Sequence, residues 1–334
     1  RRRCQGPAAR GREVGTATKS SFSRVRALGL LAAGSAAGLP SLGRAQSSTP
    51  IRVAWTASEN AAQPYYGVSQ GIFSRAGLNV ELVQFNNSAA STQALVAGAI
   101  DVSAADMIQV ASGVSRGIPL GFFAGAAIYS SAKPTLVLCV NKDSSIRKAI
   151  DLEGETVAVI ALNSISSCSV LEWLSRNGAD VSKVKIFEMP FPTMLPALQR
   201  GTIAAALFAE PFVARAKADS RPLAATYDSV GKTFYITSWF ATRDWVKKNP
   251  EVSVRFAKSL YEIARWANTH PNDTAAILSQ ITHVEVDLIR SMNRATFATS
   301  LDQRLMQPVL DIAAKYKVLD RRMSAAELVV SLPA

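Results

Sequence analysis

The chain has few of the residues on which metal sites and most hydrolytic enzymes depend. Its 334 residues include only three cysteines and two histidines. Neither His270 nor His283 has another histidine at metal-ligand spacing, so helix-end or surface positions are expected and no metal is predicted. The sequence has no phosphate-binding glycine-rich loop. These absences argue against catalytic residues and against a cofactor.

The three cysteines do not form a disulfide framework. Cys4 lies near the start of the chain, Cys139 lies in the apolar run 136–140, and Cys168 lies at a predicted helix start. A buried thiol is expected for Cys139, and a disulfide between Cys139 and Cys168 stays open. No cysteine follows the apolar run 27–39 at a cleavage position, which argues against a lipid anchor.

No hydrophobic run is long enough to cross a bilayer as a helix. The run Ala27–Leu39 is interrupted by glycines, but it follows Lys19, Arg24 and Arg26 and precedes Gly43-Arg44-Ala45. This order of a positive region, a short apolar region and a small-residue cleavage site is typical of a secretory signal. We expect residues 1–45 to be a cleavable export signal with an upstream extension, and the protein to be extracytoplasmic. An unstructured cytosolic extension is the alternative.

The net charge of the chain comes mostly from that leader. The whole sequence has 37 basic and 25 acidic residues, and residues 1–45 hold nine basic residues and one acid. The remaining 28 basic and 24 acidic residues give a net charge of +4. No cluster of Lys and Arg interleaved with aromatic residues remains, so nucleic acid is not an expected partner.

Beyond the leader, the chain contains two copies of one pattern. Ala94–Asp106 and Ala197–Phe212 both read Ala-Leu, two residues, Gly, one residue, Ile, and then a short apolar run that ends in an acid. Matching features upstream are separated by about 105, 101 and 103 residues (51 to 156, 77 to 178, 98 to 201). The order strand, helix, strand, helix, strand therefore occurs twice. The alternative is that many α/β proteins show this order without a repeat.

Short apolar strands that alternate with helices favour an α/β fold with mostly parallel sheets covered by helices. About 290 residues exceed the size of most single cores, so two lobes are expected. We assign residues 50–134 and 240–334, with the C-terminal helices, to lobe 1 and residues 135–239 to lobe 2. Helices are predicted at 59–76, 89–97, 107–116, 146–150 and 252–268. Strands are predicted at 51–55, 78–85, 100–104, 119–126, 135–140, 156–161, 181–189 and 234–245, the last as a return crossing beside 135–140.

Polar residues follow the predicted strands at the ends where α/β proteins bind ligands. They are residues 56–60, Asn87-Ser88 and Asp106 in the first copy, and Asn163 to Ser167 in the second. The hydroxyl-rich run 163–167 begins a helix, where unpaired backbone N–H groups can hold an anion or a carbonyl of a ligand. The same hydroxyls could also serve only as helix caps.

Four segments resemble a known family. Gly-Ile-Phe-Ser-Arg-Ala-Gly-Leu-Asn-Val-Glu-Leu (71–82), Leu-Val-Ala-Gly-Ala-Ile-Asp-Val (95–102), Asp-Leu-Glu-Gly-Glu-Thr-Val-Ala-Val (151–159) and Glu-Pro-Phe (210–212) are similar to the solute-binding proteins of ABC importers for nitrate, sulfonate, taurine and thiamine-precursor compounds. The resemblance implies a two-lobed periplasmic-binding-protein fold of the second type that closes over a small molecule. It also implies a monomer that delivers its ligand to a membrane permease.

Carried onto this chain, the family's cleft gives a set of ligand-binding residues at the ends of the strands and at the hinge. They are Ser58, Asn60, Asn87, Ser88, Asp106, Tyr129, Ser164, Ser166, Ser167, Glu210 and Trp239. These are acids, hydroxyls, amides and aromatic residues, with no arginine. A nitrogen-bearing or aromatic organic solute is therefore favoured over a bare inorganic anion.

Two alternatives belong to other classes. A related group on the same fold makes a pyrimidine precursor of thiamine, but its Cys-Cys-Cys-Phe-Cys motif is absent here. A ligand-sensing module that presents its closed form to a membrane receptor fits the same sequence and differs only in its partner.

Overall fold

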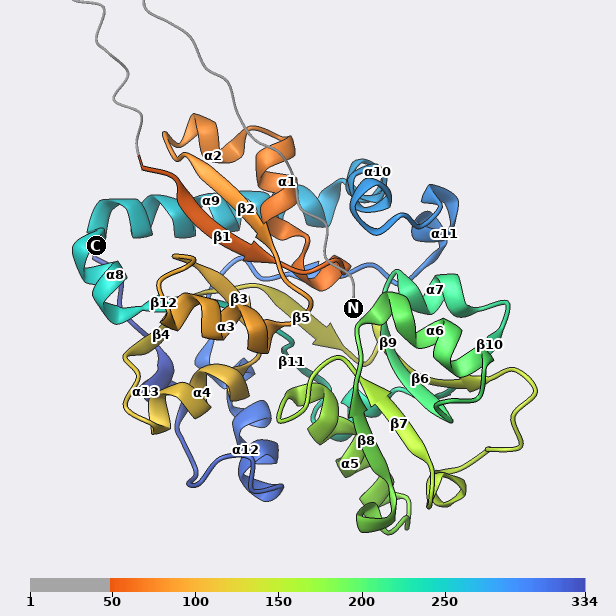
Figure 1. The fold of residues 1–334 in the computed structure, drawn as a ribbon. Helices are drawn as coiled ribbons and strands as arrows, with labels where there is room; N and C mark the ends of the chain where they lie inside the picture. The colour runs from red at the N-terminus through yellow and green to blue at the C-terminus, as the bar shows by residue number, and fades with distance from the viewer. Residues whose placement is uncertain (1–48, 334) are drawn as a thin grey trace, which may run out of the picture. The chain divides into compact units, whose positions relative to one another are not determined.

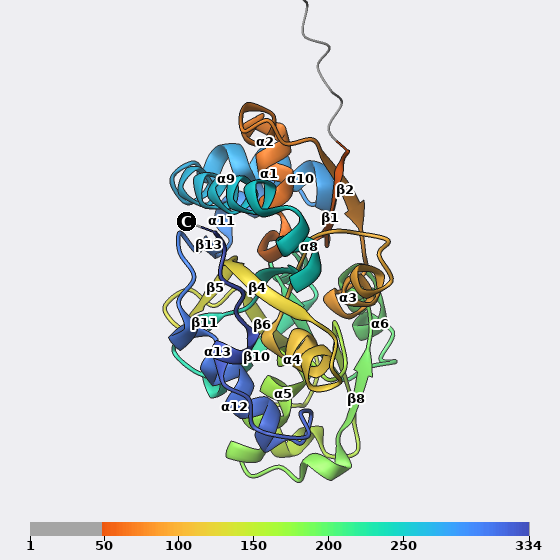
Figure 2. The same ribbon diagram turned by 90° about the vertical axis from the view of Figure 1, so that its left-hand side faces the viewer.

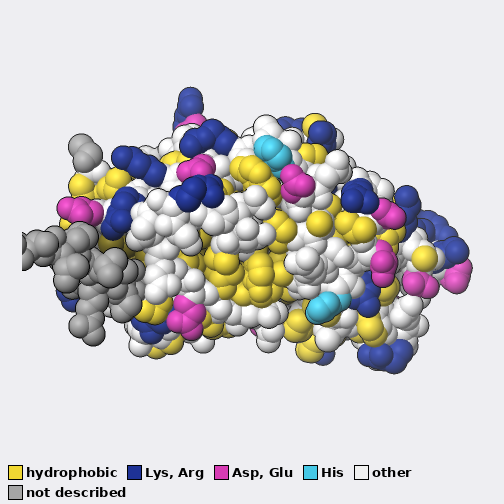
Figure 3. All heavy atoms as spheres, turned by 90° about the horizontal axis from the view of Figure 1, so that it is seen from above, with side chains coloured by type: hydrophobic (Ala, Val, Ile, Leu, Met, Phe, Trp, Pro, Cys, Tyr) yellow, Lys and Arg dark blue, Asp and Glu magenta, His cyan; other side chains and the backbone are white. Residues whose placement is uncertain are grey.

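The computed structural model describes residues 49–333 (Figure 1). The predicted export signal lies outside the described residues. No helix among residues 49–333 combines the length and the apolar content that a membrane span requires. Figure 3 shows one face of the molecule, on which Lys and Arg side chains are interspersed with Asp and Glu and the two histidines lie apart.

The first repeat forms a small parallel sheet that continues into an antiparallel one. Strand β1 (Ile51–Trp55) pairs in parallel with β2 (Val80–Gln84). On its other side, Val53 bridges to Val102, at the entry to β3 (Ser103–Ala105). Strand β3 pairs antiparallel with β12 (Ser238–Thr242), and β12 pairs in turn with β4 (Leu120–Gly125).

The second repeat lies in a five-stranded sheet with the order β10-β6-β9-β7-β8. Strand β7 (Thr156–Val159) pairs in parallel with β8 (Lys185–Glu188) and with β9 (Ala205–Ala209). Strand β6 (Leu136–Asn141) pairs antiparallel with β9, and β10 (Ser220–Ala224) covers the other side of β6. Both repeats therefore place their first strand between the second and the third, and both pair the third strand with an antiparallel strand from outside the repeat.

The glycines of the sequence pattern end helices in both repeats. Gly98 and Gly201 have φ values of 74° and 70°, in the left-handed region that glycine adopts without steric cost. The residue after each glycine donates its N–H back to the start of the last turn, from Ala99 to Ala94 (2.9 Å) and from Thr202 to Ala197 (3.1 Å). This is the hydrogen bond of a Schellman cap. The predicted repeat is thus confirmed in the strand order and in the helix ends.

The prediction of a return strand at 234–245 beside 135–140 is wrong. The segment forms two strands, and the first, β11 (Thr233–Tyr235), pairs with β5 (Ala127–Ser130), while the second is β12 in the other sheet. The place beside β6 is taken by β10, which contains Pro222. The proline and the arginine of β10 do not fit the residue pattern of a strand, so the sequence did not predict one there. An edge strand nevertheless tolerates proline, because one side of it needs no hydrogen-bond partner. The register shift of β10 also falls just after Pro222.

Two predicted helices also differ from the structure. The helix predicted at 59–76 is a 3₁₀ turn (Glu59–Ala61) followed by α1 (Gln63–Ser69) and α2 (Ile72–Arg75). Gly71, with a φ of 64°, ends the first helical run. The helix predicted at 146–150 is only a 3₁₀ turn at Ala149–Leu152.

The remaining predicted helices lie within a few residues of the observed ones. In chain order, the helices after α2 are α3 (Ser88–Val96), α4 (Met107–Ser115), α5 (Ile165–Arg176), α6 (Phe191–Gln199), α7 (Phe212–Ala216), α8 (Arg243–Lys248), α9 (Pro250–Thr269), α10 (Pro271–Thr282), α11 (Val286–Ser291), α12 (Gln307–Lys315) and α13 (Ala325–Leu328).

The C-terminal helices cover the first repeat and reach the second. Helix α9 packs its buried Phe256, Leu260 and Ile263 against α1 and α2, and Figures 1 and 2 show it beside these helices. Burying large apolar side chains contributes about 1.5–3 kcal/mol each relative to exposure. Helix α12 packs on both α4 and α5 (Figure 2). Strand β13 (Thr296–Phe297) pairs with β5, so the C-terminal region also contributes a strand to the sheet formed by β5 and β11.

The equivalence of the two glycines is testable. A Cβ atom at Gly98 or Gly201 would meet nothing within 4 Å, so an alanine there adds only backbone strain. We expect Gly98→Ala and Gly201→Ala each to lower the free energy of unfolding by about 1–2 kcal/mol in urea denaturation. Asparagine, which tolerates left-handed backbone, should cost less at both sites. Alanine variants as stable as the parent would contradict the assignment.

Candidate functional site

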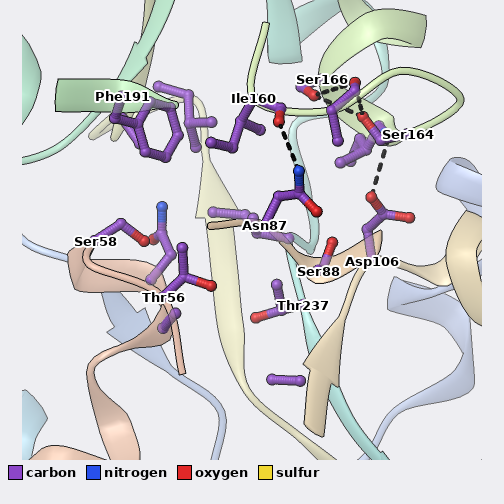
Figure 4. Close-up of a pocket in the computed structure, with 18 of the residues that line it drawn as sticks. Thr56, Ser58, Asn87, Ser88, Asp106, Ile160, Ser164, Ser166, Phe191 and Thr237 are labelled. Carbon is purple, nitrogen blue, oxygen red and sulfur yellow. Dashed lines mark hydrogen bonds between the residues drawn. The ribbon is translucent and has the colours of Figure 1, made fainter. Parts of the chain in front are cut away.

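The carboxyl ends of the repeat strands meet around a cavity of about 80 Å³ (Figure 4). This volume holds a handful of water molecules or a small organic molecule. Strands β1, β2, β3, β7, β8 and β9 each supply residues at or just after their ends. The lining consists of Thr56, Ser58, Asn60, Ala61, Asn87, Ser88, Ala104, Asp106, Leu136, Ile160, Ala161, Ser164, Ile165, Ser166, Phe191, Ala209, Tyr227, Ile236 and Thr237.

Asp106 lies at the contact between the two repeats. Its Oδ1 accepts hydrogen bonds from the backbone N–H groups of Ile108 (2.9 Å) and Gln109 (3.1 Å), and so caps the N-terminus of α4. Its Oδ2 accepts from the N–H of Ile165 (3.3 Å), at the N-terminus of α5. Burial raises the pKa of this carboxyl to about 6, although the three N–H groups oppose that rise.

The hydroxyl groups at the start of α5 mostly bond to the backbone of their own turn. Ser164 Oγ donates to the carbonyl of Ala161 (2.7 Å) and lies 2.6 Å from Ser166 Oγ. Ser167 Oγ accepts from the N–H of Ser164 (3.1 Å) and donates to the carbonyl of Ser164 (2.9 Å). These bonds form a helix cap, and Ser164 and Ser166 also line the cavity.

Asn87 connects the two repeats above the cavity. Its Oδ1 caps α3 by accepting from the N–H of Ala90 (2.9 Å). Its Nδ2 donates to Glu188 Oε1 (3.1 Å) and lies 3.5 Å from the carbonyl of Ile160 (Figure 4). Gln109 makes a similar connection, because its Nε2 donates to the carbonyl of Asn163 (2.9 Å). Hydrogen bonds between the two repeats therefore span this cavity.

Asn60 lines the cavity, and its side-chain oxygen has no protein partner within the described residues. The side chain is buried, with 6% of its surface exposed, and its Oδ1 accepts no hydrogen bond within residues 49–333. An unpaired buried acceptor costs about 1–3 kcal/mol, so a ligand donor that reached this oxygen would stabilise the complex.

The structure brings seven of the eleven sequence-predicted site residues to the cavity: Ser58, Asn60, Asn87, Ser88, Asp106, Ser164 and Ser166. It places the other four in buried contacts outside the lining. Tyr129 donates to Asp228 Oδ1 (2.9 Å), and Trp239 Nε1 donates to Gln63 Oε1 (2.8 Å). Ser167 belongs to the α5 cap, and Glu210 Oε2 accepts from the N–H of Ala214 (3.1 Å). A binding role for any of the eleven stays a prediction.

The sequence patterns did not predict several residues of the cavity lining. Phe191 follows β8 in the second repeat, at the place that Asn87 occupies after β2 in the first. Comparing the two copies position by position would have found it. Tyr227 and Thr237 come from the segment that follows β10 and from the segment between β11 and β12. No strand-end pattern points to either residue, because their place depends on how the chain crosses between the sheets.

Cys139 and Cys168 are free and buried, and burial raises the pKa of each thiol to about 12. Residues 49–333 contain no cluster of three or more His, Cys, Asp or Glu residues that could hold a metal ion.

Comparisons with known proteins point to one group. The sequence profile of the NMT1-like family matches residues 44–283. The taurine-binding periplasmic protein of Escherichia coli (strain K12) is 28% identical over 185 residues, which are 55% of this chain and 56% of that protein. The chain thus spans little more than half the length of this curated relative.

Solved structures with the same fold cover most of the chain. The alkanesulfonate-binding protein from Xanthomonas axonopodis pv. citri, bound to MOPS, matches with a TM-score of 0.71 at 15% identity, over 84% of this chain and 98% of that one. A ligand-binding component of an ABC-type import system from Staphylococcus aureus matches with a TM-score of 0.74 at 14% identity, over 84% and 96%. Likeness at this identity shows the fold.

Glu210 generates a pH prediction. Burial raises the pKa of its carboxyl to about 7, with the nearby Glu59 carboxylate adding to the rise. The folded protein therefore holds a proton between about pH 4.5 and pH 7 that the unfolded chain releases, so its stability falls as the pH rises through this window. We expect Glu210→Gln, which stays neutral, to remove up to about 3 kcal/mol of this loss.

Denaturant unfolding at pH 5 and pH 7.5 measures the difference. The exposed Glu262, changed to Gln, serves as the control and should leave the pH dependence of the parent unchanged. A Glu210→Gln protein with the parent's pH dependence would show that this carboxyl is ionised throughout the range.

Proposed function

The chain belongs to the NMT1-like family, and on this basis we propose that it is an extracytoplasmic solute-binding protein that delivers a small molecule to an ABC importer. The family resemblance predicted from the sequence is confirmed, and so is the α/β periplasmic-binding fold with its two lobes. The relatives that the chain resembles are named as binding proteins for taurine and for alkanesulfonates, not as enzymes.

The observation that carries the proposal is the composition of the cavity wall. The wall is built from strand ends of both repeats, which Figure 4 shows facing each other, and contacts from one repeat to the other close it. Asn87 contacts Glu188, Gln109 contacts Asn163, and Asp106 contacts Ile165. A site made of two opposed halves can capture a solute when the halves approach and release it when they separate.

We propose the lobe boundaries predicted from the sequence, with residues 50–134 and 240–334 in lobe 1 and residues 135–239 in lobe 2. The opening rotation would occur at β5 and β11, since these paired strands carry the chain from one sheet to the other. A permease would then distinguish the closed form from the open form. The protein would act as a monomer outside the cytoplasm, with the small molecule and the permease as its partners.

The cavity favours binding over chemistry. The only charged side chain in its described lining is Asp106, which is engaged by three backbone N–H groups. Neither histidine lines the cavity, so the lining holds no imidazole base next to its serine hydroxyls.

The first test is a search for ligands. A thermal-shift screen of the purified protein against sulfonates, nitrate, bicarbonate, pyrimidines, aromatic acids and small amines should give hits that raise the unfolding temperature with increasing concentration. A compound at 100 times its dissociation constant should add about 2.7 kcal/mol of apparent stability. Steady turnover of a hit would favour an enzyme instead.

The second test is closure. A saturating hit should reduce the radius of gyration measured by small-angle X-ray scattering, because ligand shifts the population towards the closed form. Scattering profiles that are the same with and without a bound ligand would contradict the proposal that the lobes move.

A further inference from the structure

Among residues 49–333, one charged side chain lines the cavity, and no basic side chain pairs with it. Asp106 is buried, with 4% of its surface exposed, and lines the cavity. The ion pairs of the described chain involve other acids, and the described part of the lining contains no Lys, Arg or His. Buried charges in proteins are normally paired, so this carboxylate lacks a cationic partner.

The carboxylate occupies the position where an anionic ligand would otherwise bind. The backbone N–H of Ile165 at the N-terminus of α5 is the donor that a sulfonate or nitrate would use, since the helix dipole favours negative charge there. That N–H already donates to Asp106 Oδ2 at 3.3 Å, and two N–H groups of α4 donate to Oδ1. A second anion in a cavity of about 80 Å³ would lie close to this charge and would be repelled by it.

Asn60 gives a second and independent indication. Asn60 lines the same cavity, and its fully buried Oδ1 accepts no hydrogen bond within the described residues. It lies on the turn after β1, whereas Asp106 follows β3, so the two acceptors come from different strand ends. When the amide turns its oxygen towards the cavity, an N–H donor on a ligand would satisfy that oxygen, and a positive charge on the ligand would neutralise the carboxylate.

We propose that the cavity binds a small organic cation with N–H donors, an ammonium or guanidinium compound, and that Asp106 and Asn60 select it over anions. This inference rests on the proposed solute-binding function. Tyr227 and Phe191 also line the cavity and offer aromatic surface, which attracts cations of this type. The chain thus differs in ligand charge from relatives that are named for sulfonates.

The test uses the full chain and probes small enough for the cavity. Isothermal titration at pH 7.5 compares methylguanidinium, ethylammonium and ethanolamine with ethanesulfonate, nitrate and the zwitterion taurine. We expect at least one cation to bind at least tenfold more tightly than both anions. Tighter binding of ethanesulfonate or nitrate, or binding of none of the cations, would overturn the inference.

Variants identify the residues. Asp106→Asn keeps the Oδ1 cap of α4 but removes the charge, and should weaken cation binding at least tenfold. Asn60→Leu should weaken it several-fold, whereas Asn60→Asp, which adds an acceptor charge, should retain or strengthen it. The control Glu262→Gln, on the surface, should bind like the parent. Unchanged cation affinity in Asp106→Asn would contradict the role of the carboxylate.

The parent protein offers a readout that does not depend on the folding of any variant. Methylguanidinium keeps its charge from pH 5 to pH 8, so a change in its affinity reports on the protein. The described titratable groups that interact electrostatically with Asp106 are Tyr227 and Cys168, and burial raises the pKa of both. Affinity should therefore fall several-fold as the pH drops below about 6, where Asp106 becomes protonated. An affinity that rises as the pH drops would overturn the inference.

The two proposals fail in different ways. If anions bind and scattering shows closure, solute capture stands and the cationic class is wrong. If no compound of any class binds in the broader screen, solute capture itself is wrong.

Discussion

The pairing of each repeat's third strand with a strand from elsewhere in the chain is the constraint on which the structure depends. Strand β3 pairs with β12, which arrives after the second repeat, and β9 pairs with β6, which arrives from the first. Each sheet is completed by chain that has crossed from the other side. The two crossings then pair with each other as β5 and β11, so the carboxyl ends of both sets of parallel strands face one cavity.

Much of this arrangement could be predicted from the sequence, because it depends on local signals repeated twice. Glycine at positions 98 and 201 ends a helix through backbone geometry, and the apolar residues that follow enter a buried strand in both repeats. The polar residues at the strand ends were found for the same reason. The order of the sheets could not be predicted, since the segment 234–245 reads as one strand although it belongs to two sheets. The strand that lies beside β6 could not be predicted either, because it contains Pro222.

The site shows the same division between local and long-range information. Asp106 was predicted at a strand end, and its cap on α4 follows from its position one residue before the helix. Its hydrogen bond to the N–H of Ile165 joins residues 59 positions apart, so it could not be predicted without the fold. Glu210 occupies the equivalent position in the second repeat, but its carboxylate turns to Ala214 on its own short helix. The symmetry of the backbone therefore does not extend to the charges, and one acid, not two, reaches the cavity.

Helix α12 has a consequence for the energetics of opening. It packs on α4 and on α5. At the C-terminal end of α12, Lys315 Nζ (2.6 Å) and the hydroxyl of Tyr316 (2.7 Å) donate hydrogen bonds to the buried Glu172 of α5. A rotation that separates α4 from α5 must move α12 relative to at least one of them. Contacts outside the cavity thus contribute to the equilibrium between open and closed forms, and through it to the apparent affinity for any ligand. Residues that never touch the solute can in this way set how much of it the protein retains.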